Sequence, residues 1–492
     1  KAVSKVLKEG RMFHVVPSGS GTTGNGTPGS GRWPRSAEAS QGRTPHHGYE
    51  SIAVASAVTP REATVARLSQ LSPPDGATVV TWFAILLYMV PTDRRIEALG
   101  GAGAPAYLVA LVALLWWGWH HLQKPAASGR QHLQWVRVAA FLFVGACLAS
   151  YAKAALTALP PADISVADLG LVRVAALVGI LLVANDAITS EERFMVLVRR
   201  LTLFAGLYAT LGLLQFVTGM NIVDTWQFPG LSGSGDTGIG ARAGFVRSAA
   251  TATHPLEYAV VLTMMLPFCL TVAIRDRSRS AFLRWFPVAV ITLSTVLSVT
   301  RSALLAMAAV YLVLLPSWPP KVRRAAGAAL ALGAVAVYVA VPGMAGAILG
   351  MFSTNDPSVT SRTDSYDEAM QFFLVSPFVG RGFGTFLPSY RILDNQYLLS
   401  AVEIGIVGVL ALIAVVASAM AAAYFSRRVH AGEPMKAMGL ALVASMLAGS
   451  LNFALFDAFA FPQACGTVFM VAGLCGAYAN IGRNPAVPSE LS

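Results

Sequence analysis

Residues 396–425 read QYLLSAVEIGIVGVLALIAVVASAMAAAYF, a run of thirty positions with one charged residue, Glu403. A helix needs about 20 mainly apolar residues to cross roughly 30 Å of bilayer hydrocarbon, so this run is long enough to span a membrane. A polar loop that carries Arg391 and Asp394 precedes it directly. The stretch predicts a membrane-spanning helix with two carboxylates, Asp394 and Glu403, at its mouth.

The whole chain has the composition of an integral membrane protein. Of its 492 residues, 55% are hydrophobic and only 12% are charged, and the mean hydropathy is +0.59. Soluble domains carry about 25% charged residues, roughly twice as many. The net charge of +11 would suggest nucleic acid in a soluble protein, but here Lys and Arg fall in short gaps between apolar runs, as anchors at a membrane surface do. We therefore expect membrane lipids and no nucleic acid as partners.

The cysteines lie inside apolar runs without the spacing of metal ligands, and they are expected to be small buried hydrophobic residues: Cys147, Cys269, Cys465 and Cys475. No set of His, Asp and Glu occurs at i, i+4 spacing on one predicted helix. The sequence therefore predicts neither a disulfide nor a metal site.

The pattern divides the chain into three segments. Residues 1–75 are rich in Gly, Ser, Thr and Pro and show no signal peptide, which predicts a disordered cytoplasmic tail. Residues 76–484 form the predicted transmembrane domain, and residues 485–492 a short cytoplasmic tail. The domain holds apolar runs at about 77–91, 105–119, 136–158, 168–187, 201–219, 255–274, 285–300, 302–317, 325–350, 396–425, 437–456 and 461–480. The fold class that we predict is all-α, a polytopic membrane protein of about 12 transmembrane helices; the runs lack the alternating polarity of an outer-membrane barrel.

The basic residues predict the orientation. Every second gap between the runs is short and basic, and these gaps hold 16 Lys and Arg: 120–137, 190–200, 275–284, 319–324 and 426–436. Basic residues of short loops stay on the cytoplasmic side. Both termini are therefore expected in the cytoplasm of a bacterial cell, and the two longest loops, about 220–254 and 351–395, on the outer face of its inner membrane. Long ordered loops between spans usually carry function, so we expect the active site there.

The second outer loop predicts a short amphipathic helix. Ser361 or Thr363 can cap its start, followed by acidic residues in its first turns. Its apolar side chains would rest on the membrane surface or on the helix bundle: Met370, Phe372, Phe373 and Val375. Three glycines then follow in the five residues Gly380-Arg-Gly-Phe-Gly384, which permit either a tight turn or a close approach of the backbone to a ligand.

Arg301 is the one charged residue within the apolar residues 286–317 after Trp285. A single helix over 285–317 would be about 50 Å long, too long for one crossing and short for two. We therefore expect two short helices that turn around Thr300-Arg301-Ser302, somewhat below the outer surface. An arginine there costs roughly 3 kcal/mol on insertion scales unless it faces the bundle and meets an anion; snorkelling to head groups and an internal ion pair are the structural alternatives.

The first outer loop ends on further polar residues before and within the helix predicted at 255–274: Arg242, Arg247, His254 and Glu257. Pro255 suits the first helical turn. A structural cap or ion pair explains these residues as well as a ligand contact does.

The predicted outer face thus carries four arginines and two carboxylates: Arg242, Arg247, Arg301, Arg362, Asp394 and Glu403. Guanidinium groups bind phosphate oxygens in pairs, and a neighbouring carboxylate can take a proton from an attacking hydroxyl. Such a cluster suits a lipid-linked phosphate or pyrophosphate. Glu403 lies nine residues beyond Asp394, about two and a half turns deeper, where we expect it to pair with an arginine such as Arg301.

Residues 240–425 resemble the O-antigen ligase and polymerase-like membrane proteins of bacterial surface polysaccharide assembly. The matching elements, in order, are Arg242-Ala-Gly with Thr253-His254-Pro255, the arginine-x3-leucine element Arg301 to Leu305, the outer loop with Arg362, Pro377, Gly380 and Gly384, and Asp394-Asn-Gln-Tyr-Leu398. In the ligases the last element usually begins with a histidine. Here the spacing to Gly405 is kept, but the first residue is Asp394.

The resemblance implies a glycosyltransferase that needs no cofactor, nucleotide sugar or metal. Its donor would be a saccharide linked to polyprenyl pyrophosphate, and a hydroxyl of a glycan or lipid acceptor would attack the anomeric carbon. The catalytic residues carried over are Arg301 and Arg362, which would bind the pyrophosphate, and Asp394, which would act as the base. The candidate substrate-binding residues are Arg242, Arg247, His254, Glu403, Gly382 and Gly384. Other polysaccharide assembly proteins are the implied partners.

Two other functions fit the same residues. A secondary transporter or flippase would bind its substrate with these charges and would favour inverted repeats and broken helices, and no repeat is visible between the two halves. A structural partner of an assembly complex is the third hypothesis, but it leaves the outer arginines unexplained. The sequence does not distinguish a ligase from a polymerase, and it does not give the sugar, the linkage, the acceptor or the oligomeric state.

Overall fold

The computed structural model describes residues 75–123, 133–157, 159–233, 239–242, 244–350 and 357–483. The two predicted tails, apart from Asp75, lie outside these residues. Of Arg242 and of residues 357–364, which include Arg362, only the backbone is described.

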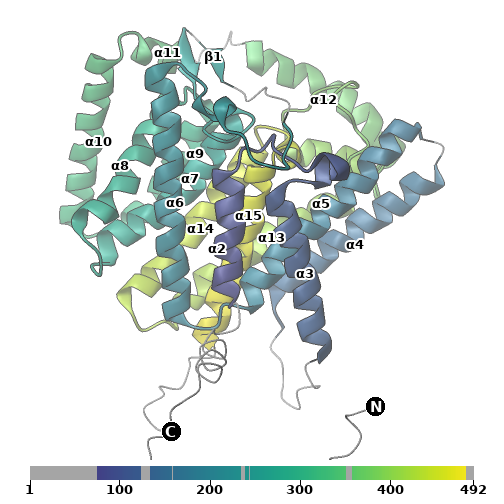
Figure 1. Ribbon diagram of the computed structural model, residues 1–492, viewed down its shortest axis with the longest axis horizontal. Coiled ribbons are helices and arrows are strands. Elements are labelled where there is room, and N and C mark those ends of the chain that lie inside the picture. The colour runs from purple at the N-terminus through teal and green to yellow at the C-terminus, as the bar shows by residue number, and fades with distance from the viewer. Residues whose placement is uncertain are drawn as a thin grey trace, which may run out of the picture. The chain divides into compact units, whose positions relative to one another are not determined.

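Helices make up nearly all of this part of the chain (Figure 1). The α-helices, short 3-10 helices (η) and strands are α2 (Gly76–Met89), η1 (Glu97–Ala102), α3 (Pro105–Gln123), α4 (Trp135–Leu156), α5 (Pro161–Asp186), α6 (Glu191–Thr218), η2 (Ile222–Thr225), β1 (Gly240–Arg242), β2 (Phe245–Arg247), α7 (Pro255–Arg275), α8 (Ala281–Leu297), α9 (Arg301–Leu314), η3 (Leu315–Ser317), α10 (Pro320–Ala340), α11 (Met344–Gly350), α12 (Pro357–Val375), α13 (Gln396–Ser426), α14 (Glu433–Phe453), η4 (Ala458–Ala460) and α15 (Pro462–Arg483).

The predicted polytopic helical architecture is confirmed, with one short antiparallel hairpin, β1–β2, added to it. Each of the twelve apolar runs contains a helix. Among the described residues, eight helices are long and apolar enough to cross a membrane, and three apolar segments are shorter: α2, α8 and α9 with η3. The number of twelve spans stays a prediction.

The predicted division of residues 285–317 into two short helices is confirmed, although the turn lies just before Arg301 rather than around it. α8 ends at Leu297 and α9 begins at Arg301, so the 33-residue run is divided into two short helices. Val299, in the turn, has a φ of 49°, a left-handed conformation that β-branched residues rarely adopt. Pro255 is the first residue of α7, as its fixed φ predicts.

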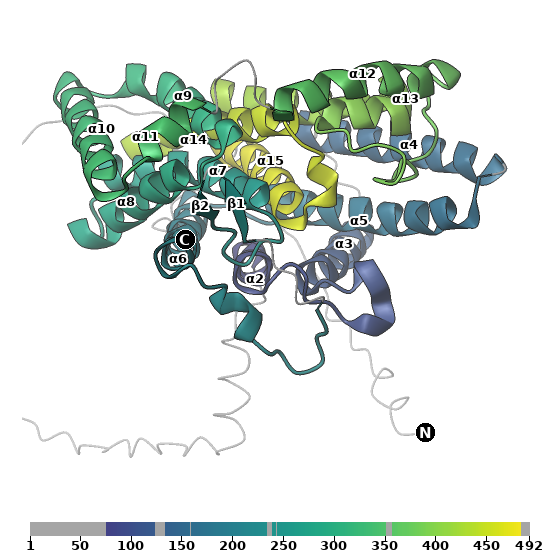
Figure 2. The same cartoon turned by 90° about the horizontal axis from the view of Figure 1, so that it is seen from above.

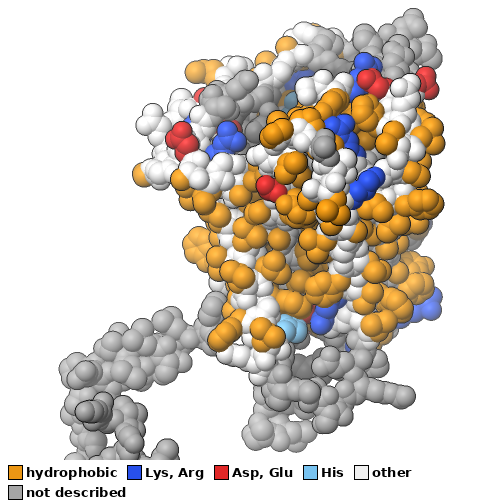
Figure 3. Space-filling view, turned by 90° about the vertical axis from the view of Figure 1, so that its right-hand side faces the viewer, with side chains coloured by type: hydrophobic (Ala, Val, Ile, Leu, Met, Phe, Trp, Pro, Cys, Tyr) orange, Lys and Arg blue, Asp and Glu red, His pale blue; other side chains and the backbone are white. Residues whose placement is uncertain are grey.

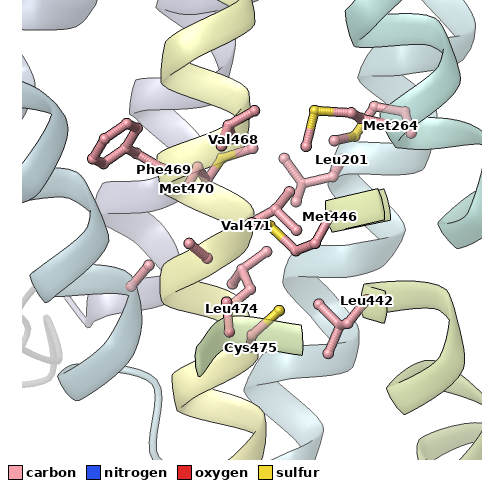
Figure 4. Close-up of a cluster of buried hydrophobic side chains, with 14 of the residues drawn as sticks. Leu201, Met264, Leu442, Met446, Val468, Phe469, Met470, Val471, Leu474 and Cys475 are labelled. Carbon is pink, nitrogen blue, oxygen red and sulfur yellow. The ribbon is translucent and has the colours of Figure 1, made fainter. Parts of the chain in front are cut away.

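α7 and α15 lie at the centre of the bundle. In the most apolar 18-residue window of each, 94% of the residues are buried, whereas in α10 the fraction is 6%. Seen from above, α15 lies between a group that contains α8 and α10 and a group that contains α4, α12 and α13 (Figure 2). Figure 4 shows Val468, Met470 and Val471 of α15 near side chains of α6, α7 and α14.

The central helices pack closely because their contact residues are small. A Cβ on Gly473 of α15 would lie 2.4 Å from the carbonyl oxygen of Leu181 on α5. Within a membrane, where apolar burial does not drive helix association, such close backbone approach is a main source of packing energy. The predicted burial of the four cysteines is also confirmed.

Successive helices run in opposite directions, so their connections gather at two ends of the bundle. At one end, called the basic end, residues of the predicted basic gaps meet: Arg199 Nε lies 2.6 Å from Asp276 Oδ2, and Arg275 Nη1 lies 3.6 Å from Glu433 Oε2. The other end, called the site end, is where α7, α9, α13 and α15 begin. Figure 3 shows a broad apolar band on one face, with charged side chains mainly toward its two ends, as expected of a protein that spans a bilayer.

Candidate functional site

The first outer loop enters the core after the β1–β2 hairpin. Ala249 and Ala250 donate their backbone N–H groups to Gln215 Oε1 at 3.2 and 2.7 Å. Thr251 is fully buried and donates its hydroxyl to the carbonyl oxygen of Tyr88 at 2.7 Å. These bonds fix the position of the residues that follow, including His254.

His254 is the N-cap of α7 and accepts the N–H of Leu256 on its Nδ1 at 3.1 Å. A neutral imidazole with an accepting Nδ1 carries its proton on Nε2. Burial lowers the pKa of His254, the charge of Arg247 lowers it further, and the charge of Asp394 raises it in part. His254 therefore lies within electrostatic reach of both residues and is a neutral N–H donor at pH 7.

Arg247 reaches the start of α9. Its Nη2 donates to Thr300 Oγ1 at 3.2 Å, and Thr300 is the N-cap residue directly before Arg301. The first outer loop and the α8–α9 turn, 53 residues apart in sequence, thus bring Arg247 and the first turn of α9 together. The first N–H groups and the dipole of a helix N-terminus add to the positive potential there.

Asp394 lies directly before the cap of α13. Asn395 Oδ1 accepts the N–H groups of Tyr397 and Leu398 at 3.0 and 3.2 Å, which fixes the entry of the chain into the helix. Gln396 Oε1 accepts the N–H of Phe459 at 2.8 Å and so attaches the α14–α15 turn to this point.

Asp457, on that turn, is a candidate site residue that sequence reasoning missed. Burial raises its pKa from the ordinary value of 3.8 to about 6, and the nearby charge of Asp394 contributes to the rise. The same turn reaches His254, because the rings of His254 and Phe461 are 5.8 Å apart. The available sequence signal was a single carboxylate between two apolar runs.

The glycine loop, residues 376–385, docks on a break in α13. Gly405 inside α13 has a φ of 66°, and Ile406 N donates to the carbonyl oxygen of Pro377 at 2.8 Å. Gly382 N donates to the carbonyl oxygen of Glu403 at 2.9 Å. Loop and helix therefore satisfy each other's backbone groups, as a helix break at membrane depth requires.

Only glycine fits this docked loop at several positions. Gly380, Gly382 and Gly384 have φ of 77°, 138° and 76°. A Cβ on Gly380 would lie 2.2 Å from the carbonyl oxygen of Glu403, and one on Gly405 would lie 2.3 Å from the carbonyl carbon of Phe378. The tight-turn alternative therefore accounts for the glycines by itself, whereas their predicted contact with substrate stays a prediction.

The buried Glu403 lies beneath the same loop. Its Oε1 accepts the N–H of Phe386 at 3.2 Å, so the expected partner Arg301 is not needed to satisfy this oxygen. Arg381 fastens the loop to α5: its Nη2 donates to Asp163 Oδ2 at 2.6 Å, and its guanidinium lies 4.5 Å from the ring centroid of Tyr390.

The start predicted for the helix of the second outer loop was wrong. α12 begins at Pro357, four residues before Ser361. The fixed φ of proline suits the first position of a helix, so Pro357 can begin the helix there. Its apolar face divides: Phe372 and Phe373 pack against a cluster with Phe386, whereas Met370 and Val375 are exposed.

The structure thus brings Arg247, His254 and Asp394 to the same end of the bundle as Arg301, and it adds Asp457. Glu403 and Gly382 lie at the contact between the glycine loop and α13, and the backbone of Gly384 also bonds to the Glu403 carboxylate. The side chains of Arg242 and Arg362 are outside what is described.

A polytopic membrane protein with a group of ionisable side chains at one end of its helices is the class that these features define. Residues 286–413, about a quarter of the chain, match the family described as O-antigen ligase. The match runs from α8 into α13 and includes Arg301, Arg362 and Asp394, and it confirms the resemblance to O-antigen ligases over these residues. Arg247 and His254 precede it. No curated protein matches the chain.

Replacing Gly405 by alanine should misplace the glycine loop. The left-handed φ costs an alanine about 1–2 kcal/mol, and the clash with Phe378 adds roughly 1–3 kcal/mol. Gly219→Ala is the matched control, since its φ is 67° and a Cβ there would meet nothing within 4 Å. In detergent, Gly405→Ala should unfold at a clearly lower temperature than Gly219→Ala; equal temperatures would mean that the loop does not depend on this contact.

Asp457→Asn should stabilise the protein at high pH only. Because the pKa of Asp457 is raised to about 6, the folded chain holds this proton more tightly than the unfolded chain, and that stability is lost as the pH rises from about 4 through 6. Asparagine stays neutral, so the variant should melt at a higher temperature than the parent at pH 8 and at the same temperature below about pH 4.

Asp276→Asn is the control of opposite sign. Burial alone would raise the pKa of Asp276, but hydrogen bonds from Arg199 and Ser278 lower it on balance. This variant should therefore be less stable than the parent at neutral pH, with the difference shrinking in acid. A pH-independent difference for Asp457→Asn would contradict the assignment of a raised pKa.

Proposed function

We propose that this protein is a membrane glycosyltransferase, a polysaccharide ligase or polymerase, that transfers a glycan from a polyprenyl-pyrophosphate donor to an acceptor hydroxyl. The observation that supports this function most directly is the hydrogen bond from Arg247 to Thr300 at the start of α9. In this contact the Arg247 guanidinium lies beside the first turn of α9, which begins with Arg301. The charges of Arg247 and Asp394 both shift the pKa of His254, so His254 lies near both of them. Cations, a neutral N–H donor and a carboxylate from separate segments thus lie at one end of the bundle.

The cationic part of the site suits a pyrophosphate. Arg247 and Arg301 offer planar N–H forks, and the α9 N-terminus offers backbone donors and a favourable dipole. Arg242 and Arg362, from the two outer loops, would supply further charge. These groups would hold the donor and stabilise the negative charge that develops on the leaving pyrophosphate.

Asp394 is the proposed base. The acceptor oxygen attacks the anomeric carbon and its proton passes to Asp394, while the bond from the anomeric carbon to the pyrophosphate oxygen breaks and the lipid pyrophosphate leaves. Burial and the charge of Asp394 raise the pKa of the neighbouring Asp457, so this second carboxyl group lies within electrostatic reach of the proposed base. His254 Nε2–H would orient the acceptor.

The proposed location is the bacterial inner membrane, with both termini in the cytoplasm and the site end outside. The basic end carries residues of the predicted cytoplasmic gaps, such as Arg199 and Arg275, which supports this orientation. A polyprenyl-linked donor would then present its glycan at the outer membrane surface, beside the loops that hold the site.

The short helix pair α8–α9 and the break at Gly405 favour a transporter, since transporters bind substrates and ions at short or unwound helices. Here, however, backbone groups beside the break bond to the glycine loop: Ile406 N to Pro377 and the Glu403 carbonyl to Gly382. They are engaged in the structure rather than presented to a substrate. The glycosyltransferase is therefore the better-supported function.

The direct test offers the purified full chain a polyprenyl-pyrophosphate oligosaccharide with an acceptor glycan. Arg301→Ala should lower the release of polyprenyl pyrophosphate and the formation of the new glycan together, by roughly 100-fold or more, as the loss of a charge-stabilising donor does. Arg362→Ala should do the same.

Arg279→Ala, a change in the predicted basic gap 275–284, is the matched control and should keep full activity. A chain that moves the donor across a vesicle membrane but forms neither product would be a transporter. Normal product formation in both Arg301→Ala and Arg362→Ala would overturn the proposed function.

A further inference from the structure

A cavity of about 510 Å³ lies at the basic end, between α4, α5, α13 and α15, and the proposed reaction does not use it. Its lining includes Gln134, Trp135, Asn185, Ala421, Phe425 and Arg483. Its volume is within the range of about 300–1,000 Å³ that is typical of sites for organic ligands.

The cavity exists because its walls are built from small side chains. α13 contributes Ala417, Ala421 and Ala422, and α15 contributes Gly476 and Ala479. From Ala417 to the end of α13 at Ser426 the wall rises by roughly 13 Å along the helix axis. This wall offers an apolar slot of a length suited to part of an acyl chain.

Polar groups gather in the wall where α5 and α15 end. Asn185 is 1% exposed, and its Oδ1 has no hydrogen-bond partner in the described part of the chain. Its Nδ2 donates to Gln134, and Asn480 Nδ2 donates to the Asn185 carbonyl oxygen at 3.1 Å. Asn185 Oδ1 packs against Gly476, so the polar groups that this end of the cavity can offer a ligand are the amides of Gln134 and Asn480.

The charge at the mouth is positive. Arg483 is exposed, and in the described residues it forms no ion pair. The neighbouring Asp186 would oppose an anion, but it is already held by Arg137 Nη2 at 3.0 Å and by Trp117 Nε1 at 2.7 Å. The mouth is therefore complementary to a negative group.

Aromatic side chains place this mouth at the level of the lipid head groups. Trp135 is 61% exposed and Phe425 is 66% exposed, at the start of α4 and the end of α13. Exposed tryptophans are enriched at the boundary between hydrocarbon and water. A lipid at this height would place its head group near Arg483 and its chain along the alanine wall.

We propose that this cavity binds an anionic phospholipid from the leaflet that faces the basic end. The phosphate and the polar head group lie at Arg483 and the amides, and one acyl chain lies between α13 and α15. Basic pockets between membrane helices bind anionic lipids by the same chemistry. The site is independent of the proposed glycosyl transfer, which takes place at the other end of the helices.

The test is native mass spectrometry of the full chain in detergent, titrated with phosphatidylglycerol or with phosphatidylcholine of the same acyl chains. The parent should retain phosphatidylglycerol more tightly. Arg483→Gln should weaken that binding about five-fold, the contribution of one basic residue near a membrane surface, and should leave phosphatidylcholine unchanged.

Ala421→Phe should fill the slot and remove the binding of both lipids. Arg428→Gln, an exposed arginine outside the cavity lining, is the matched control and should bind as the parent does. If Ala421→Phe does not fold, the comparison of Arg483→Gln with Arg428→Gln still tests whether the cavity binds an anionic lipid. The proposal would be overturned if the parent retained the two lipids equally, or if Arg483→Gln bound phosphatidylglycerol as the parent does. It would also be overturned if the parent were a dimer that Ala421→Phe abolishes, because a second copy of the chain would then occupy the cavity.

Discussion

The backbone contact between the glycine loop and the break in α13 is the constraint on which the site end depends. Gly405 interrupts α13, and the neighbouring Ile406 N–H and Glu403 carbonyl pair with Pro377 and Gly382. Unsatisfied backbone groups at membrane depth would cost several kcal/mol each, so helix and loop hold one another in place. Ser150 strengthens the joint, since its hydroxyl also donates to the Glu403 carbonyl oxygen at 2.6 Å.

The same joint determines where the polar groups of the second outer loop lie. The glycine loop carries Arg381 onto Asp163 of α5 and leads the chain back to Asp394 at the start of α13. The first outer loop is held independently, by Gln215 and Thr251 in the core. Two loops fixed by separate contacts can therefore present cations and carboxylates at the site end without relying on attraction between those charges.

Much of the helical framework could be predicted because the bilayer restricts the possible structures. Long apolar runs have to form helices, and a 33-residue run with one arginine has to turn, as it does before Arg301. The start of α12 was missed because the polar stretch before it contains several residues that could cap a helix equally well. The helix begins at Pro357 instead. The role of the glycines was left open because φ and close approach depend on the segment that packs against them.

The site could be predicted only in its list of charges. Asp457 was missed because a single carboxylate between two apolar runs is typical of an ordinary turn. Only the fold shows that the bond from Phe459 to Gln396 holds this turn beside the start of α13, next to Asp394. The expected pairing of Glu403 with Arg301 stays a prediction, and the structure adds a backbone amide of the loop that satisfies one carboxylate oxygen of Glu403. Backbone partners of this kind are set by tertiary structure and leave no pattern in the sequence.

The most direct measurement is the affinity of the purified protein for polyprenyl pyrophosphate compared with polyprenyl monophosphate. If Arg247 and the start of α9 form the pyrophosphate site, the parent should bind the pyrophosphate more tightly, and Arg247→Gln should lose about ten-fold in affinity for it and little for the monophosphate. Equal affinity for the two lipids, unchanged in Arg247→Gln, would contradict the account.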